Sequence, residues 1–175
     1  MQRFRETLEP HFQLYPHLHL AFLHTKLLSE ICAEVYLSQE GQAVNTALDM
    51  VTILVSGPNM VPVLTEHSAA LVSVTLVQTL RADPVRLTRV LNELRGVLVT
   101  KRISPAWRSA INNFITAKLD AYHTKSNDRG GLQHLADAAV GANPGRGMDD
   151  GQSSGDVDAA DLSAFRKLGY LPMFA

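Results

Sequence analysis

Five successive segments of this 175-residue chain carry apolar residues at every third or fourth position, and this spacing limits the fold more than any other feature. Between His17 and Leu37, for example, Leu20, Leu23 and Leu27 follow this spacing. Such a period places apolar side chains on one face of an α-helix. The predicted helices span residues 17–37, 42–55, 63–80, 84–100 and 105–122. The sequence therefore predicts an all-α fold, a compact bundle of about five helices followed by a flexible acidic, glycine-rich tail.

Local signals mark where these helices begin and end. Asp83–Pro84 offers a capping carboxylate followed by a proline suited to the first helical turn, and Ser104–Pro105 repeats this start signal. Ser56–Pro58 ends the second helix because glycine and proline interrupt helical backbone there. Uncharged residues fill every face of the third helix from 67 to 80, so we expect this helix at the centre of the bundle.

The charge distribution separates a helical body from a tail. Residues 1–125 contain 12 basic and 10 acidic residues, whereas residues 126–175 contain 4 basic and 7 acidic residues. Glycines concentrate in the first part of the tail, and such a composition buries too little apolar surface to offset the entropy of ordering. We therefore predict a helical portion over 1–125, a flexible linker over 126–157 and a short acidic-hydrophobic terminal segment over 158–175.

Composition and spacing exclude several classes of protein. The formal net charge of −1 provides no strong positive field, so we expect no direct binding to nucleic acid. The apolar stretch of the first helix is interrupted by Lys26, Glu30 and Glu34, which disfavours a membrane span. Lone Cys32 has apolar neighbours, so we predict a small buried side chain in an intracellular protein.

Catalytic and metal-binding patterns are also weak in this sequence. His17 and His24 share a helix face but stand two turns apart, about 10 Å along the axis, which is too far to ligate one ion. Neither a nucleophile motif nor a cofactor fingerprint occurs. We predict no catalytic residue, no metal site and no cofactor, and hence a protein that is not an enzyme; an α-helical enzyme fragment remains the least favoured alternative.

The terminal segment is the first candidate site for a protein partner. Short acidic-hydrophobic segments can fold as amphipathic turns in a partner's groove. The alternative is that this segment packs back onto its own helical body. The residues concerned are Asp158, Asp161, Leu162, Phe165, Leu168, Tyr170 and Phe174.

A run of basic residues around the fourth helix is the second candidate site. It would dock an acidic partner or the acidic tail of this same chain. The alternative is an ordinary solvated helix surface. This predicted basic docking face consists of Arg81, Arg86, Arg89, Arg95, Lys101 and Arg102, with Arg108 beyond it.

The order of the helices resembles the C-terminal half of the fungal-specific transcription factor domain, the helical regulatory region of binuclear zinc-cluster activators. The segments that carry the resemblance are His17–Leu28, Ala47–Leu54, Ser68–Leu76 and Val90–Leu94 followed by Trp107. The resemblance covers residues 1–125. It implies a regulatory domain in the nucleus that contacts transcription machinery or the rest of its own protein, and it allows a small-molecule effector.

One departure from that family bears on function. The family contacts DNA through a six-cysteine zinc cluster, whereas this chain has one cysteine and no basic cluster, so the resemblance implies a regulatory portion without its DNA-binding region. The alternative function is a stand-alone helical adaptor unrelated to transcription, in which the apolar central helix and the basic residues form a partner surface.

Overall fold

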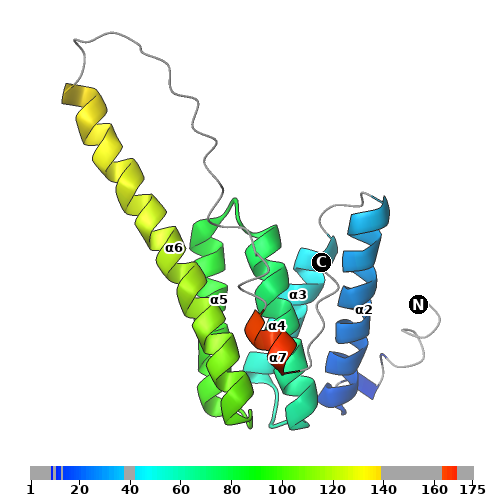
Figure 1. The fold of residues 1–175 in the computed structure, drawn as a ribbon. Helices are drawn as coiled ribbons and strands as arrows, with labels where there is room; N and C mark the ends of the chain where they lie inside the picture. The colour runs from blue at the N-terminus through cyan, green and yellow to red at the C-terminus, as the bar shows by residue number, and fades with distance from the viewer. Residues whose placement is uncertain (1–8, 10, 13, 38–41, 139–162, 169–175) are drawn as a thin grey trace.

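The structure, a computed structural model, describes residues 9, 11–12, 14–37, 42–138 and 163–168, which are helical almost throughout (Figure 1). This part of the chain contains no strand, which confirms the predicted all-α fold. The helices are α2 (Pro16–Leu37), α3 (Gln42–Ser56), α4 (Pro62–Thr79), α5 (Pro84–Thr100), α6 (Pro105–Ala138) and α7 (Ser163–Lys167).

The first four predicted helices are confirmed to within one residue at each end. At the start of α5, the Asp83 carboxylate accepts a hydrogen bond from the N–H of Arg86 at 3.0 Å, so the capping prediction is also confirmed. At the end of α3, the N–H of Gly57 donates to the Ile53 carbonyl at 2.8 Å. A Cβ at Gly57 would lie 2.5 Å from that same oxygen, so this turn requires glycine.

Helix α4 lies at the centre of the bundle, as its uncharged faces predicted. It packs against α2, α3, α5 and α6, and residues 68–77 are all buried. The side chains at its centre form one hydrophobic core with the inner faces of the surrounding helices. Because four helices touch α4, its placement fixes the relative positions of the rest of the body.

Helix α6 is longer than the sequence analysis predicted. It does not end near Tyr122 but continues to Ala138, and its far end projects beyond the other helices (Figure 1). Residues 126–138, which the sequence analysis assigned to a flexible linker over 126–157, are thus helical, while 139–157 lie outside the described residues. Glycines 130 and 131 weaken a helix without blocking its hydrogen bonds, and an established helix adds residues at low cost.

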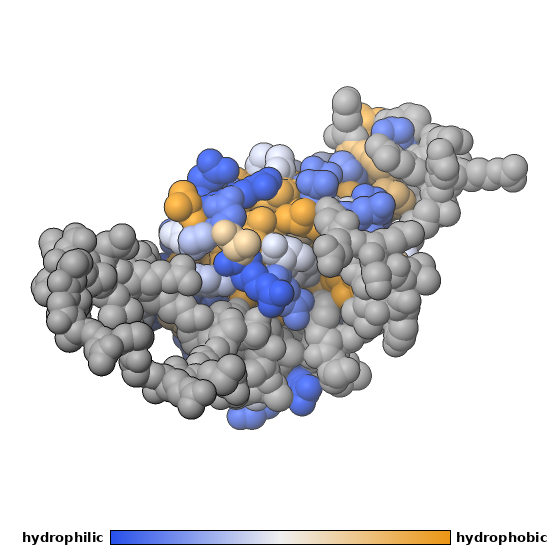
Figure 2. All heavy atoms as spheres, turned by 90° about the horizontal axis from the view of Figure 1, so that it is seen from above, coloured by the Kyte–Doolittle hydropathy of each residue, from blue (hydrophilic) through white to orange (hydrophobic). Residues whose placement is uncertain are grey.

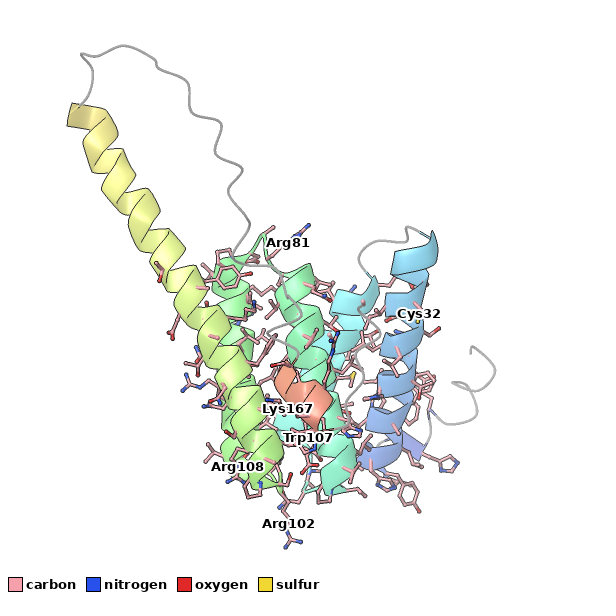
Figure 3. The ribbon with its side chains drawn as sticks, in the orientation of Figure 1. Cys32, Arg81, Arg102, Trp107, Arg108 and Lys167 are labelled. Carbon is pink, nitrogen blue, oxygen red and sulfur yellow. The ribbon has the colours of Figure 1, made fainter. Side chains whose placement is uncertain are left out.

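Two further features complete the body. The five-residue helix α7 packs against α6, which brings the terminal segment back to the bundle (Figure 1). Cys32 on α2 is a free thiol that is only partly buried, so the prediction of a buried side chain is wrong. It lies on α2, the helix at one edge of the bundle (Figure 3).

Candidate functional site

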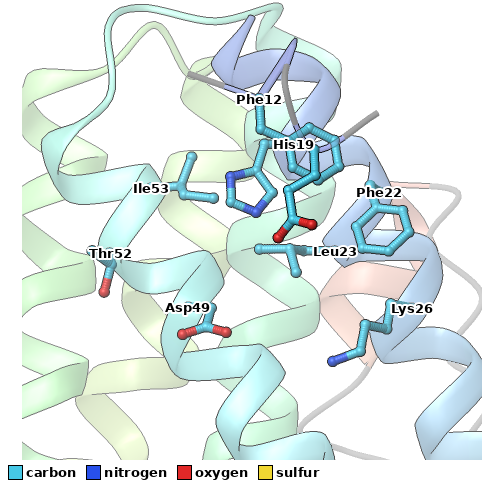
Figure 4. Close-up of a pocket in the computed structure, with 9 residues that line it drawn as sticks. Phe12, His19, Phe22, Leu23, Lys26, Asp49, Thr52 and Ile53 are labelled. Carbon is cyan, nitrogen blue, oxygen red and sulfur yellow. The ribbon is translucent and has the colours of Figure 1, made fainter. Parts of the chain in front are cut away.

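A concave site lies between α2, α3 and the residues that precede α2 (Figure 4). It encloses about 510 Å³, a volume suited to a small organic ligand. We call it the α2/α3 pocket. It is lined by Glu9, Phe12, His19, Phe22, Leu23, Lys26, Asp49, Thr52 and Ile53.

One wall of the α2/α3 pocket is aromatic. The ring of Phe12 stacks on the ring of His19, with centroids 4.3 Å apart and planes 6° from parallel. The Phe12 ring also lies 5.4 Å from the ring of Phe22, centroid to centroid. Because Phe12 precedes α2 while His19 and Phe22 belong to it, these contacts hold the preceding residues against the helix and shape the pocket.

The opposite side of the pocket is charged. Lys26 of α2 and Asp49 of α3 extend toward one another (Figure 4). The Lys26 ammonium lies 3.1 Å from a carboxylate oxygen of Glu30 and donates to the Thr46 hydroxyl at 2.7 Å. Glu30 therefore compensates the charge of Lys26, and the carboxylate of Asp49 adds negative charge to the pocket lining. This arrangement suits a ligand with an apolar body and a positively charged group.

A second polar contact joins α2 to α4. Nδ1 of His24 lies 3.1 Å from Oγ of Ser68, whereas a serine hydrolase pairs its serine with Nε2 of the histidine. Ser68 is also fully buried within α4, so a substrate has no access to its hydroxyl. Burial lowers the pKa of His24, and the nearby charge of His67 lowers it further. The pair therefore connects α2 to α4, and burial of this contact favours the neutral form of the His24 imidazole.

The lowered pKa of His24 predicts that the body loses stability in mild acid. A lowered pKa means that the unfolded chain binds a proton more readily, so this contribution is complete above the ordinary histidine pKa of about 6.5 and declines as the pH falls below it. The melting temperature should be lower at pH 5.5 than at pH 7.5, and His24→Gln should reduce that difference. His17→Gln, at an exposed position of the same helix, is the control and should leave the difference unchanged.

The structure does not bring the predicted basic docking face together on one side of α5. Arg86 and Arg95 are nine positions apart on this helix, which places them about 180° from one another. Arg81 precedes α5 and Arg102 follows it, so the two lie at opposite ends of the bundle (Figure 3). Lys101 is half-buried and donates to the carbonyl of Gly57, where it supports the end of α3. Arg89 is exposed near Arg86.

A groove between α5 and α6 is lined in part by Arg95, one residue of the predicted basic docking face. The α5/α6 groove measures about 620 Å³, and Arg95 and Arg108 are among the residues that line it. Arg108 also donates to the carbonyl of Ile103 at 3.2 Å, so part of its hydrogen-bonding capacity is used within the body. Viewed from above, hydrophilic and hydrophobic residues alternate over the visible described surface (Figure 2). The basic residues thus contribute to several small surfaces.

The described part of the terminal segment packs against the body. Phe165 of α7 is fully buried, and its ring lies 5.6 Å from Phe114 and 6.3 Å from Trp107 of α6, centroid to centroid. Leu168 packs against the same core. For these two residues the structure favours the alternative in which the segment packs on its own body. Of the predicted contact residues, those outside the described residues are Asp158, Asp161, Leu162, Tyr170 and Phe174.

The described residues contain neither a metal-binding cluster nor a membrane-spanning helix. Within 9–37, 42–138 and 163–168, apart from the undescribed positions 10 and 13, no three histidine, cysteine or acidic residues are placed to hold a metal ion. None of the described helices is long and apolar enough to cross a membrane. Comparisons with family models, curated proteins and solved structures found no match to this chain.

Sequence reasoning did not identify the α2/α3 pocket. Its lining comes from three separate stretches of chain, and only their packing brings Phe12, His19 and Asp49 together. One signal was present: Lys26 and Glu30, four residues apart, are oppositely charged residues within a helix rich in apolar residues. Charged residues at that spacing pair on one helix face, so they indicated a polar patch within an apolar surface.

Proposed function

We propose that this chain is the non-catalytic regulatory portion of a fungal transcription factor, without its DNA-binding region, and that the α2/α3 pocket is its effector site. The family assignment is supported by the resemblance over residues 1–125 and by the all-α body. The observation that carries the effector role is the pocket, which joins an aromatic wall to the carboxylate of Asp49. The effector would be an organic amine with an apolar body, and the protein would act in the nucleus.

The pocket is suited to regulation because it spans an interface between helices. A ligand that touches both α2 and α3 would favour one relative placement of the two, and α3 in turn packs on the central α4. Binding can shift a conformational equilibrium only through such differential contacts. A change at this pocket would thus reach the helices that contact α4.

A reporter assay tests the proposal. The full chain, fused to a foreign DNA-binding domain in a fungal host, should change reporter transcription at least two-fold relative to that domain alone. Asp49→Asn should abolish at least half of this change because it removes a pocket carboxylate. Asp120→Asn, at an exposed position of α6, is the matched control and should behave like the parent.

The second candidate function is a stand-alone helical adaptor, which the seating of α7 on α6 favours. A reporter that does not respond to the folded, nuclear fusion would reject the transcription role and leave the adaptor. A response that Asp49→Asn and Asp120→Asn alter equally would reject the effector role of the pocket. The two parts of the proposal are therefore separable.

A further inference from the structure

A single aromatic side chain attaches α7 to the body. Phe165 has no exposed surface and meets the rings of Trp107 and Phe114, which lie two turns apart on one face of α6. Trp107 also lies 4.9 Å from the ring of His67 on α4, centroid to centroid. We call the surface formed by Trp107 and Phe114 the aromatic socket.

Helix α7 depends on this socket for its own structure. It has only five residues, and isolated helices shorter than about 12 residues are marginal in water. Arg166 and Lys167 are exposed in its last turn, so Phe165 and the partly buried Leu168 supply its apolar contact. Seating of Phe165 and formation of α7 are therefore expected to occur together.

The same apolar side chains cannot serve two surfaces at once. A short amphipathic helix binds a partner by inserting its aromatic anchor into an apolar groove, and Phe165 is the anchor that this segment offers within its described residues. While Phe165 occupies the aromatic socket, a partner has no access to its ring. Phe165 therefore cannot pack on the body and bind in a partner's groove at the same time.

We propose that the aromatic socket is a docking site for a short helix with one phenylalanine, occupied in cis by this chain's own α7, and that release of α7 exposes the socket and Phe165 together. The occupant is seen in place, since α7 packs against α6 (Figure 1). Residues 139–162 join the two helices, so the local concentration of α7 favours the cis contact over the same segment added in trans. This inference goes beyond the proposed function and concerns a different surface from the α2/α3 pocket.

The chain carries its own probe for this test, because Trp107 is its one tryptophan. In the full chain, Phe165→Ala should shift Trp107 emission to longer wavelength and raise its acrylamide quenching constant at least two-fold. Arg166→Ala, at an exposed position of α7, should change neither quantity. Far-UV circular dichroism should show that both variants retain the helical body, since α7 contributes only five residues.

A peptide covering residues 158–175 then completes the test in trans. Added to the full-length Phe165→Ala variant, it should restore Trp107 emission and quenching in a saturable manner, while the same peptide carrying alanine at 165 should not. In the parent chain the peptide should leave Trp107 emission unchanged, because its own α7 already occupies the aromatic socket. Unchanged Trp107 fluorescence in folded Phe165→Ala, or equal restoration by both peptides, would overturn the proposal. Should Phe165→Ala lose helicity, Phe165→Leu would replace it under the same criteria.

Discussion

Replacing Leu71 by alanine is expected to lower the free energy of unfolding by about 3 kcal/mol. Leu71 has no exposed surface, and it lies in α4, which packs against α2, α3, α5 and α6. Truncation removes apolar contact and leaves a cavity that the four surrounding helices cannot close without losing contacts elsewhere. Urea denaturation followed by circular dichroism at 222 nm would measure the change as a shift of the midpoint at constant slope.

The control for this prediction is the same truncation at a surface position. Leu14 is 72% exposed, so Leu14→Ala should change the free energy of unfolding by no more than about 0.5 kcal/mol. A loss of that small size in Leu71→Ala would show that α4 is not the centre of the core. The comparison holds the chemical change constant and varies only the burial.

Helix positions could be predicted from the sequence because their signals act locally. The apolar period sets the inner face of each helix, and the cap at Asp83 depends on a residue only three positions away. The end of α6 could not be predicted in the same way. Glycine is a frequent signal for the end of a helix, yet neither glycines 130 and 131 nor their neighbours forbid helical backbone. The sequence analysis therefore predicted an end of the helix at a place where α6 continues.

Surfaces were harder to predict than helices because closeness in sequence does not fix closeness in space. Arg86 and Arg95 belong to one charged run but face opposite sides of α5. The α2/α3 pocket shows the converse, because Phe12 and Asp49 line one cavity although 37 positions separate them in the sequence. Such a site depends on which helices pack together. The apolar period shows which face of a helix is buried, but it does not show which other helix packs against that face.

The terminal segment illustrates an ambiguity that sequence could not resolve. An amphipathic turn anchored by Phe165 has the same pattern whether it packs on its own body or on another protein, because both surfaces are apolar grooves. The structure distinguishes these two for the described residues, since Phe165 lies against Trp107 and Phe114. The sequence analysis placed Phe165 among seven candidate contact residues but did not single it out as the anchor.

The other large effect is expected at Glu66, a buried acid that joins α4 to the start of α6. Its side chain is only 5% exposed, and one carboxylate oxygen accepts a hydrogen bond from the N–H of Ser104 at 2.6 Å. Ser104 immediately precedes Pro105, the first residue of α6, where backbone N–H groups lack partners within the helix. The negative charge of Glu66 also interacts favourably with the positive end of the helix dipole.

Glu66→Ala should therefore lower the free energy of unfolding by about 2–3 kcal/mol, the range for losing a buried hydrogen bond to a charged group. Glu66→Gln retains the size and an acceptor oxygen, so it should lose only about 1 kcal/mol. Glu93→Ala, at an exposed position of α5, is the control and should change stability by less than about 0.5 kcal/mol. Trp107 lies in the first turn of α6, so its emission should shift in Glu66→Ala before global unfolding begins. Equal losses in Glu66→Ala and Glu66→Gln would mean that the charge, and not the hydrogen bond, stabilises this end of α6.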